Sequence, residues 1–401
     1  MTVTKIQRLN AQALGVDENG QHAAYVLPQE NVEITEGVAR IVEPSASRVK
    51  APCSHFKKCG GCSLQHASDD FVAEWKVDAV VQALATQGVE VAQRPEIYTS
   101  PPASRRRAKL TAKRTKSGAM VGFMSARSHT LLSIPNCRVL CPEIMSGLPM
   151  LEALTVMGAS RKAQVSLSVT SSAAGLDVDV SGGKPLTDPF RLEVTQFAQR
   201  YGLARISWDG ELIVTLAPPT QSFGSLTVQP PVGAFLQATQ DGEQALAQTV
   251  AEAVGQSKSV IDLFAGCGTF AARLVSKAKV HAVEGSQDML AALDAGWRKA
   301  QNVKHLSTEV RDLFRRPLDA DELKPYDAIV LDPPRAGAAA QVVHIARAQS
   351  PLVVMVSCNP SSFARDAKVL VDGGYRLDRL TVVDQFRWSS HIEAVGVFRR
   401  V

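Results

Sequence analysis

Four short, almost uninterrupted apolar segments follow one another after residue 235, and helical stretches separate them. The segments are residues 260–264, 280–283, 328–331 and 352–356. Strands that are apolar on both faces are typical of a parallel sheet covered by helices on both sides. We therefore expect an α/β domain of the nucleotide-binding type over residues 235–401.

The chain before residue 235 has a different character. Residues 4–45 contain short β segments broken by turn residues, which is compatible with a small five-stranded barrel. Residues 69–87 have apolar side chains at helical spacing, and two alternating segments around Gly175 predict a hairpin. We expect three domains over residues 1–48, 49–234 and 235–401, with the central one rich in β structure.

The composition excludes several classes of protein. Charged residues make up 21% of the 401 positions and hydrophobic residues 45%, which is ordinary globular usage and excludes a disordered, collagen-like or disulfide-stapled chain. No segment approaches the roughly 18 apolar residues of a membrane span. The first ten residues lack the apolar region of a secretory signal, so we expect a cytoplasmic protein without a membrane partner.

A Gly-x-Gly loop follows the first apolar segment, in the sequence Asp262-Leu-Phe-Ala-Gly-Cys-Gly-Thr-Phe. Glycines in such a loop let the backbone approach a ligand closely. Glu284 closes the next segment, 22 residues after Asp262, where a carboxylate can accept both hydroxyls of a ribose. A Gly-x-Gly alone is more often an ordinary turn, but with this acid nucleoside binding is favoured. The absence of a third glycine indicates S-adenosylmethionine rather than a dinucleotide.

Reactive side chains follow the next two apolar segments. Asp332-Pro-Pro-Arg comes first, and enzymes that methylate exocyclic amines have a related signature, so it does not settle the reaction. Ser357-Cys358-Asn-Pro comes second, and its cysteine should lie at the ligand-binding edge of the sheet, although most cysteines are buried and inert. Glu393, in His-Ile-Glu near the C-terminus, is a candidate general base, although a single glutamate is normally a solvated charge.

Three cysteines within ten residues, Cys53, Cys59 and Cys62, rarely arise for packing alone. A fourth thiolate would complete a site for zinc or an iron–sulfur cluster, and a histidine, His55 or His66, could instead complete a zinc site. Cys137 and Cys141 both compete for the fourth position. Spacing alone leaves the metal open.

Seven basic side chains occur between residues 105 and 116 without an acidic one. Three of them are consecutive arginines, Arg105, Arg106 and Arg107, and guanidinium groups bind phosphates in a forked geometry. On composition alone, RNA contact and a solvated strand face are about equally good interpretations of this run.

Together these motifs resemble the S-adenosylmethionine-dependent RNA 5-methyluridine (uracil-C5) methyltransferases. The branch resembled is the bacterial 23S rRNA enzymes with a [4Fe–4S] cluster and an N-terminal TRAM domain, an OB-like barrel. The resemblance is most specific in C-x5-C-G-G-C-x2-Q-H, D-P-P-R-A-G, S-C-N-P and H-I-E. It implies a Rossmann-like catalytic domain behind a TRAM-like module and a central domain that carries the cluster.

The resemblance also assigns roles to individual residues. It implies that Cys358 is the nucleophile, which adds to C6 of the base, and that Glu393 accepts the C5 proton. The cluster ligands would be Cys53, Cys59, Cys62 and Cys137. The cofactor-binding residues would be Gln237, Phe264, Gly266, Thr269, Glu284 and Asp332. Three positions depart from the family pattern: Thr239 and Thr269 each replace an asparagine, and Arg387-Trp388 replaces a stretch that usually contains proline.

The function that follows is methylation of C5 of a uridine in RNA, most simply in 23S rRNA. The target must be single-stranded or flipped out of its helix, because a paired uridine cannot present C6 to a thiolate. The alternatives are the same reaction on tRNA, methylation of an exocyclic amine, and a non-catalytic iron–sulfur RNA-binding protein. We expect a monomer.

Overall fold

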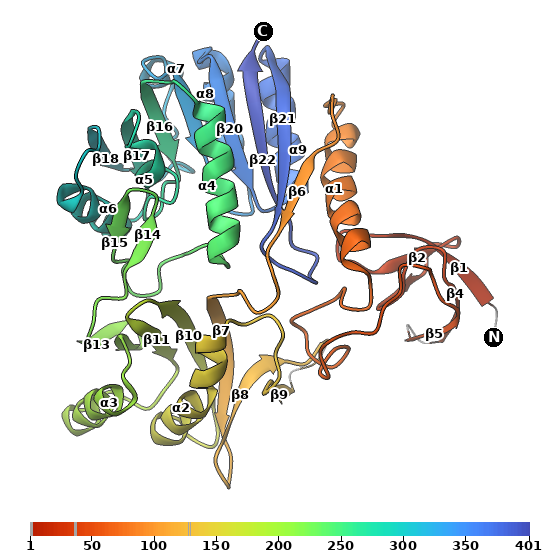
Figure 1. Ribbon diagram of the computed structural model, residues 1–401, viewed down its shortest axis with the longest axis vertical. Coiled ribbons are helices and arrows are strands. Elements are labelled where there is room, and N and C mark those ends of the chain that lie inside the picture. Colours follow the sequence, from red (N-terminus) through yellow and green to blue (C-terminus); the bar gives the residue numbers. More distant parts are fainter. Residues whose placement is uncertain (1–2, 36–37, 127, 129) are drawn as a thin grey trace.

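The computed structural model describes residues 3–35, 38–126, 128 and 130–401. Within these ranges the chain forms an α/β body, a central β-rich body and a small N-terminal sheet, which lie around a common junction (Figure 1). No helix in the described part has the length and apolarity needed to cross a bilayer.

The α/β body is built on a sheet of eight described strands in the order β18-β17-β16-β19-β20-β22-β21-β6. Strands β16 to β20 run parallel to one another, and β22 is antiparallel to both β20 and β21. The strands are β6 (Glu96–Thr99), β16 (Ser259–Leu263), β17 (Lys279–Glu284), β18 (Leu306–Val310), β19 (Ala328–Leu331), β20 (Leu352–Ser357), β21 (Tyr375–Asp384) and β22 (Glu393–Arg400). The four predicted apolar strands are therefore confirmed as neighbours.

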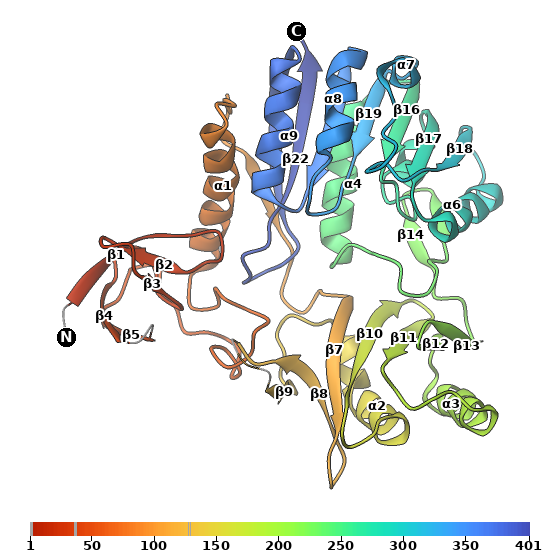
Figure 2. The ribbon, with the colours of Figure 1, turned by 180° about the vertical axis from the view of Figure 1, so that it is seen from behind.

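Helices cover both faces of this sheet (Figures 1 and 2). The first core holds α4, α5, α6 and the β14-β15 hairpin, and the second holds α1, α7, α8 and α9. These elements are α1 (Asp69–Thr86), α4 (Gln240–Val254), α5 (Ala271–Leu274), α6 (Gln287–Lys299), α7 (Ala320–Leu323), α8 (Ala339–Ala348), α9 (Pro360–Asp372), β14 (Gln221–Phe223) and β15 (Leu226–Val228).

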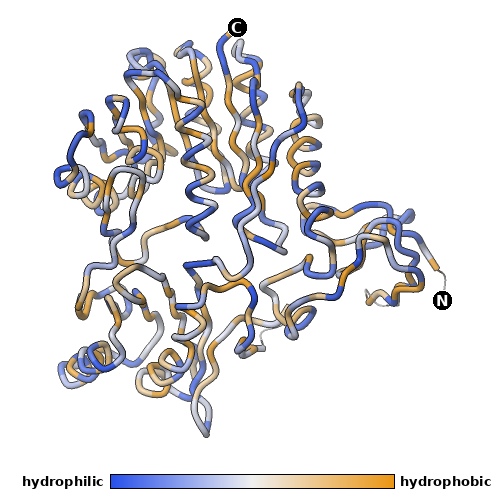
Figure 3. Tube along the Cα trace, in the orientation of Figure 1, coloured by the Kyte–Doolittle hydropathy of each residue, from blue (hydrophilic) through white to orange (hydrophobic). Residues whose placement is uncertain are grey.

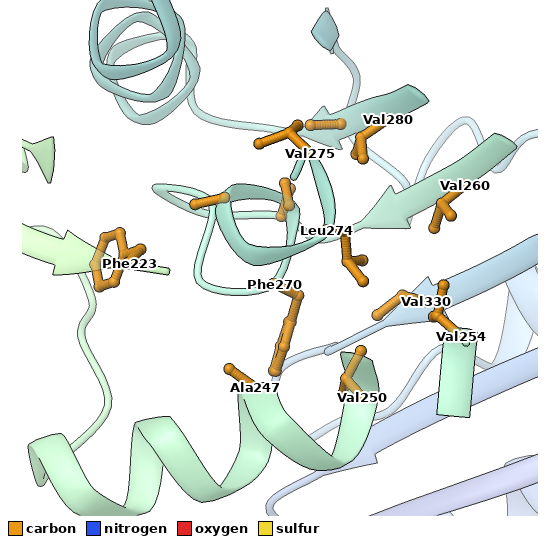
Figure 4. Packing of buried hydrophobic residues seen from close by; sticks show 14 of the residues in the cluster. Phe223, Ala247, Val250, Val254, Val260, Phe270, Leu274, Val275, Val280 and Val330 are labelled. Atoms are coloured by element: carbon orange, nitrogen blue, oxygen red, sulfur yellow. The ribbon is translucent and has the colours of Figure 1, made fainter. Parts of the chain in front are cut away.

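Successive residues of β20 alternate between the two cores, which explains why the strand is apolar throughout. Val354 and Val356 belong to the first core, while Val353 and Met355 belong to the second. Figure 3 shows hydrophobic residues concentrated along the strands of this sheet and on one side of its helices. In the first core the ring of Phe270 points towards α4 (Figure 4).

Two elements from before residue 100 belong to the α/β body. Strand β6 pairs in parallel with β21, and α1 packs on α9. The helix predicted over residues 69–87 is therefore confirmed, but it and β6 lie outside the β-rich body to which the range 49–234 assigned them. The physical reason is that α1 has an apolar stripe, which the sheet edge and α9 bury together.

The central body contains a sheet of seven described strands in the order β13-β12-β11-β10-β7-β8-β9, with two helices on one face. Its elements are β7 (Arg107–Arg114), β8 (Ala119–Met124), β9 (Leu131–Ser133), α2 (Pro142–Gly158), β10 (Gln164–Ser172), β11 (Gly175–Ser181), α3 (Asp188–Tyr201), β12 (Arg205–Trp208) and β13 (Glu211–Thr215). The hairpin predicted around Gly175 is confirmed as the antiparallel pair β10-β11.

The N-terminal sheet pairs in the linear order β3-β2-β1-β4-β5 within the described residues. Its strands are β1 (Val3–Leu9), β2 (Gly15–Asp17), β3 (His22–Ala23), β4 (Asn31–Thr35) and β5 (Val38–Glu43). The predicted strand-rich module is therefore present.

Candidate active site and cysteine cavity

The side chains singled out from sequence gather where the parallel strands end. Glu284 ends β17, Asp332 follows β19 and Cys358 follows β20. Glu393 begins the antiparallel strand β22 beside them. This is the edge of an α/β sheet at which ligands bind.

The loop after β16 has the geometry of a close-approach ligand site. Gly266 has φ +56°, and a Cβ built there would meet nothing within 4 Å, so this glycine leaves open space. Gly268 has a packing role, because a Cβ there would lie 2.4 Å from Leu293. Phe264 has φ +61°, which is strained for a residue with a side chain, and such strain concentrates at functional sites. Thr269 lies half-buried in the same loop.

The carboxylate of Glu284 is fixed by two backbone N–H groups. Gly266 donates to Oε2 and Ser286 donates to Oε1, both at 3.0 Å. These contacts orient the carboxylate beside the open space at Gly266. A fixed carboxylate beside open space can accept hydrogen bonds from the hydroxyl groups of a ribose.

A chain of amides leads from the Asp332 carboxylate into the junction with the central body. Gln237 Nε2 donates to Asp332 Oδ2 at 3.5 Å, and Gln385 Nε2 donates to Gln237 Oε1. Gln385 Oε1 in turn accepts from the N–H of Ala238 at 2.7 Å. Burial raises the pKa of Asp332 to about 7. Thr239, one of the departures from the family pattern, caps α4.

Cys358 is half-buried in the loop between β20 and α9. This loop is tied to the Asp-Pro-Pro-Arg loop, because Asn359 Nδ2 and Ser362 Oγ both donate to the carbonyl of Arg335, at 3.0 and 3.1 Å. Burial, followed by the charges of Glu393 and Asp332, raises the pKa of the Cys358 thiol to about 11. The Arg335 guanidinium opposes this rise, so it is the cationic group available to the thiolate.

Glu393 is only 4% exposed. Burial, followed by the charge of Asp332, raises its pKa to about 8, while a hydrogen bond with Gln385 acts in the opposite direction. A carboxyl group whose pKa lies near neutrality can both accept and return a proton. The charges of Glu393 and Asp332 act on the Cys358 thiol, and the charge of Asp332 acts on Glu393, so the three side chains lie within electrostatic reach of one another.

His391 lies at the same edge of the sheet, and its ring is neutral. Burial and the nearby Arg335 charge lower the pKa of His391 to about 4, so its ring can accept a hydrogen bond at neutral pH. Arg335 Nη2 lies 2.6 Å from His391 Nδ1.

A separate cavity is lined by the four cysteines that the resemblance implicates: Cys53, Cys59, Cys62 and Cys137. Burial, together with the charges of the other three cysteines, raises the pKa of Cys62 to about 12. His55 also lines the cavity, and its Nε2 is buried without a hydrogen-bond partner. Cys141 instead lies at the N-cap of α2.

The donor atoms around the cysteine cavity are mostly sulfur. Across the described ranges, no group of three or more His, Cys, Asp or Glu side chains is arranged to hold a metal ion. The donor set that the cavity offers is four thiols together with the imidazole of His55.

The side chains of the basic run, which lies just before and along β7, differ in exposure. Arg106 is only 8% exposed, with its guanidinium against Glu243 of α4 and also bonded to Gln221. The interpretation of Arg106 as a phosphate contact is therefore wrong, because the side chain joins two bodies instead. Lys109 and Lys113 are exposed on the face of β7 that also carries Arg107.

Aromatic rings accompany the two other arginines at this junction. The Arg107 guanidinium lies 5.5 Å from the ring centre of Phe235, which is 59% exposed. The Arg105 guanidinium lies 5.7 Å from the ring of Phe386 and also lines the cysteine cavity. Together they place positive charge and aromatic surface between the two bodies.

Arg387 and Trp388 are directed towards the N-terminal part of the chain. The Arg387 guanidinium contacts Asp69 and donates to the carbonyl of Ser100 at 3.1 Å. The Trp388 side chain is buried, and its indole donates to Asp69 at 3.3 Å. Arg387 and Trp388, which depart from the family pattern, therefore make contacts within the protein.

Sequence reasoning missed two residues of the site. Nothing in the local pattern distinguishes Gln385, whose partners are 147 and 148 positions away. Lys76 did leave a signal, since it lies four positions after Val72 and four before Val80, on the apolar stripe of α1. Its side chain is fully buried beneath the site.

Comparison with known proteins places this geometry among RNA-modifying enzymes. Residues 229–400 match the family described as tRNA (Uracil-5-)-methyltransferase. An RNA methyltransferase of Mesorhizobium japonicum is 41% identical over 98% of this chain and 96% of its own. The 23S rRNA (uracil(1939)-C(5))-methyltransferase RlmD of Vibrio vulnificus is 30% identical over 98% of this chain and 93% of its own.

A solved structure shares the fold along the whole chain. The tRNA (uracil-54, C5)-methyltransferase of Pyrococcus abyssi, in complex with S-adenosyl-L-homocysteine, superposes with a TM-score of 0.78. The match covers 99% of each chain at 22% sequence identity. It establishes a common architecture for all three bodies.

Proposed function

Because this chain belongs to the RNA (uracil-C5)-methyltransferase family, we propose that it methylates C5 of a specific uridine in RNA through a transient bond to Cys358. The observation that carries the proposal is the shared position of Cys358, Asp332 and Glu393 at one edge of the sheet, where the two carboxylates act on the pKa of the thiol. Methylation of an exocyclic amine would leave Cys358 without a role.

S-adenosylmethionine supplies the electrophilic methyl group when it is bound. The residues that would hold it are Gln237, Phe264, Gly266, Glu284 and Asp332. The open space at Gly266 and the fixed carboxylate of Glu284 fit an adenosyl ribose. Thr269 lies in the same loop, where its hydroxyl is available for a further contact.

The chemistry requires a covalent step because C5 of uracil is a weak nucleophile. The Cys358 thiolate adds to C6, and the electron pair of the C5–C6 double bond moves to make C5 nucleophilic. After C5 has gained its methyl group, Glu393 takes the C5 proton. The electrons of that C–H bond restore the double bond, and the Cys358 sulfur leaves C6.

The electrostatics of the site suit these roles. Arg335 is the cation that favours the Cys358 thiolate. The raised pKa of Glu393 makes its carboxylate a stronger base than an exposed glutamate, which helps it to accept a carbon-bound proton.

The junction between the bodies supports RNA as the substrate. Lys109 and Lys113 on β7 offer contacts to phosphates, while Phe235 offers an aromatic face for a base. We assign the N-terminal sheet as a TRAM-like OB module and propose that it provides a second contact with RNA. Bases unpaired in a loop can stack on such surfaces and enter the site.

We assign the target to 23S rRNA. The support is the 30% identity to the RlmD enzyme of Vibrio vulnificus over nearly the whole chain. The Pyrococcus abyssi enzyme acts on tRNA but shares only 22% identity, which speaks for the fold alone.

We assign a [4Fe–4S] cluster to Cys53, Cys59, Cys62 and Cys137. The support is that all four thiols line one cavity, since cysteine thiolates are the usual ligands of such clusters. Methyl transfer requires no electron carrier. We therefore assign the cluster a structural role, in which it joins the loop of residues 53–66 to the segment around Cys137.

The experiment is to incubate the purified protein with S-adenosylmethionine carrying a labelled methyl group and with unmodified 23S rRNA or tRNA. We expect 5-methyluridine in the 23S rRNA only, and none with Cys358→Ala. Methylation of tRNA alone would overturn the assignment of the target, and a methylated exocyclic amine would overturn the reaction.

A further inference from the structure

The loop of residues 385–392, named here the base loop, connects β21 to β22. Strand β21 ends at Asp384, and β22 begins at Glu393, the general base of the proposed function. The direction of the Glu393 side chain therefore depends on the path of this loop.

A single buried side chain from another part of the sequence holds both ends of the base loop. Lys76 Nζ donates to Asp384 Oδ1 at 2.6 Å, to the carbonyl of Phe386 at 3.2 Å and to the carbonyl of His391 at 2.8 Å. A lysine ammonium has three donors, and all three are used here. Two acceptors lie at the start of the loop and one lies just before Glu393.

Packing alone does not explain a lysine at this position. Lys76 is 0% exposed, and burying its charge costs free energy that the ion pair with Asp384 must offset. Val77, Val80 and Leu84 already pack α1 into the second core. An apolar side chain at position 76 would serve the helix equally well, but it could not bind two carbonyls of the base loop.

The middle of the base loop is held from the same side. The N–H groups of Ser63 and Leu64 both donate to the carbonyl of Trp388 at 2.9 Å. Asp69, at the start of α1, binds Arg387 and the Trp388 indole. The segment that directly follows Cys62 therefore forms a fixed wall for the loop that leads to Glu393.

We propose that Lys76 is a positioning residue for methyl transfer: by fixing both ends of the base loop, it aims the Glu393 carboxylate at the C5 proton. The inference rests on the proposed function, since it requires Glu393 to be the base. It assigns α1, which is remote in sequence from the catalytic motifs, to the active site.

The test compares three variants of the full-length protein with wild type. Lys76→Met removes the donor, and Lys76→Met combined with Asp384→Asn also removes the carboxylate charge that would otherwise be left buried without a cationic partner. Asp78→Asn is the matched control, because Asp78 is an exposed residue of the same helix. Each variant is assayed for thermal unfolding, affinity for S-adenosylhomocysteine, kcat, KM and covalent protein–RNA complex.

We expect the double variant to fold and to bind S-adenosylhomocysteine like wild type. Its kcat should fall at least tenfold with KM within twofold, and it should accumulate a covalent complex with methylated RNA, as Glu393→Gln should. Asp78→Asn should behave like wild type.

Two outcomes would overturn the inference. One is a folded double variant with wild-type kcat, and the other is a parallel loss of cofactor affinity and turnover, which would indicate a general structural role. Glu393→Gln is run alongside to separate the two proposals. If that variant turns over normally, the base assignment itself fails, and the inference fails with it.

Discussion

The guanidinium of Arg106 is buried against the carboxylate of Glu243, although Arg106 lies within the most basic run of the sequence. The pair joins the start of the central sheet to helix α4 of the α/β body. Its third contact is with the carbonyl of Gln237, and the N–H of that same peptide, from Ala238, donates to Gln385 in the amide chain of the active site. An arginine that the sequence suggests as an RNA contact is thus used to join the two bodies.

Arg106→Ala should destabilise the protein. It leaves the Glu243 carboxylate buried without its partner, which costs about 3–5 kcal/mol. Chemical denaturation measures this loss. The double variant Arg106→Met, Glu243→Leu removes both charges and should recover most of the stability. Equal stability of Arg106→Ala and wild type would contradict the buried pairing.

RNA binding should depend on Lys109 and Lys113 instead. Replacing either with alanine should lower the salt dependence of binding by about 0.7–0.9 in log–log slope for each phosphate that the side chain neutralises. Fluorescence anisotropy between about 50 and 200 mM salt measures the slope. The exposed Lys324, in the α/β body and paired with Asp321, is the control for removal of a positive charge. An unchanged slope in the double Lys109, Lys113 variant would remove this face from the RNA surface.

Cofactor binding should require the carboxylate of Glu284. Glu284→Gln replaces a charged acceptor of ribose hydroxyls, a change of about 1.5–3 kcal/mol. Calorimetry with S-adenosylhomocysteine should show binding weaker by about one to two orders of magnitude. Asp288→Asn, an exposed acid at the start of α6, should bind normally. Normal binding by Glu284→Gln would place the ribose elsewhere.

The rate of release of RNA from the covalent complex should rise with pH between 6 and 8. The pKa of Glu393 is raised to about 8, so its ionised, proton-accepting fraction grows about tenfold per pH unit below that value. The rate should level off above pH 8. Rapid-quench measurements on pre-formed complex follow this step apart from the thiol, whose pKa is higher. A rate that falls as the pH rises through this range would contradict the role of Glu393.

The iron content should depend on Cys62 but not on Cys141. Cys62→Ser removes a thiol that faces the shared cavity, whereas Cys141 lies outside it at the start of α2. Anaerobic purification with iron and sulfide analysis should give four irons in wild type and in Cys141→Ser. Zinc in place of iron in the wild-type protein would overturn the cluster assignment.

The features that could be predicted from the sequence are those that depend on neighbouring residues in the chain. Apolar strands such as residues 352–356 are recognisable because both of their faces are buried, and Cys358 follows such a strand directly. The gathering of Glu284, Asp332 and Cys358 could likewise be predicted, because parallel strands end at one edge.

The remaining features depend on long-range contacts. Strand β6 joins the sheet beside β21, almost 300 residues later, and no local pattern indicates this pairing. Arg106 looks like its neighbours in the sequence, and only its contacts with Glu243 and Gln221, more than 100 residues later, bury it. Lys76 acts through partners more than 300 residues distant, and Gln385 links Glu393 to residues more than 140 positions away.

The most direct test of the account is a covalent bond between Cys358 and the target base. RNA that carries 5-fluorouridine at the target lacks the C5 proton that Glu393 must remove, so the adduct cannot resolve. Incubation with S-adenosylmethionine, followed by nuclease and protease digestion and mass spectrometry, identifies the modified peptide. The account predicts one methylated fluorouridine on Cys358 and none in Cys358→Ala. An adduct on another residue, or one that persists in Cys358→Ala, would contradict it.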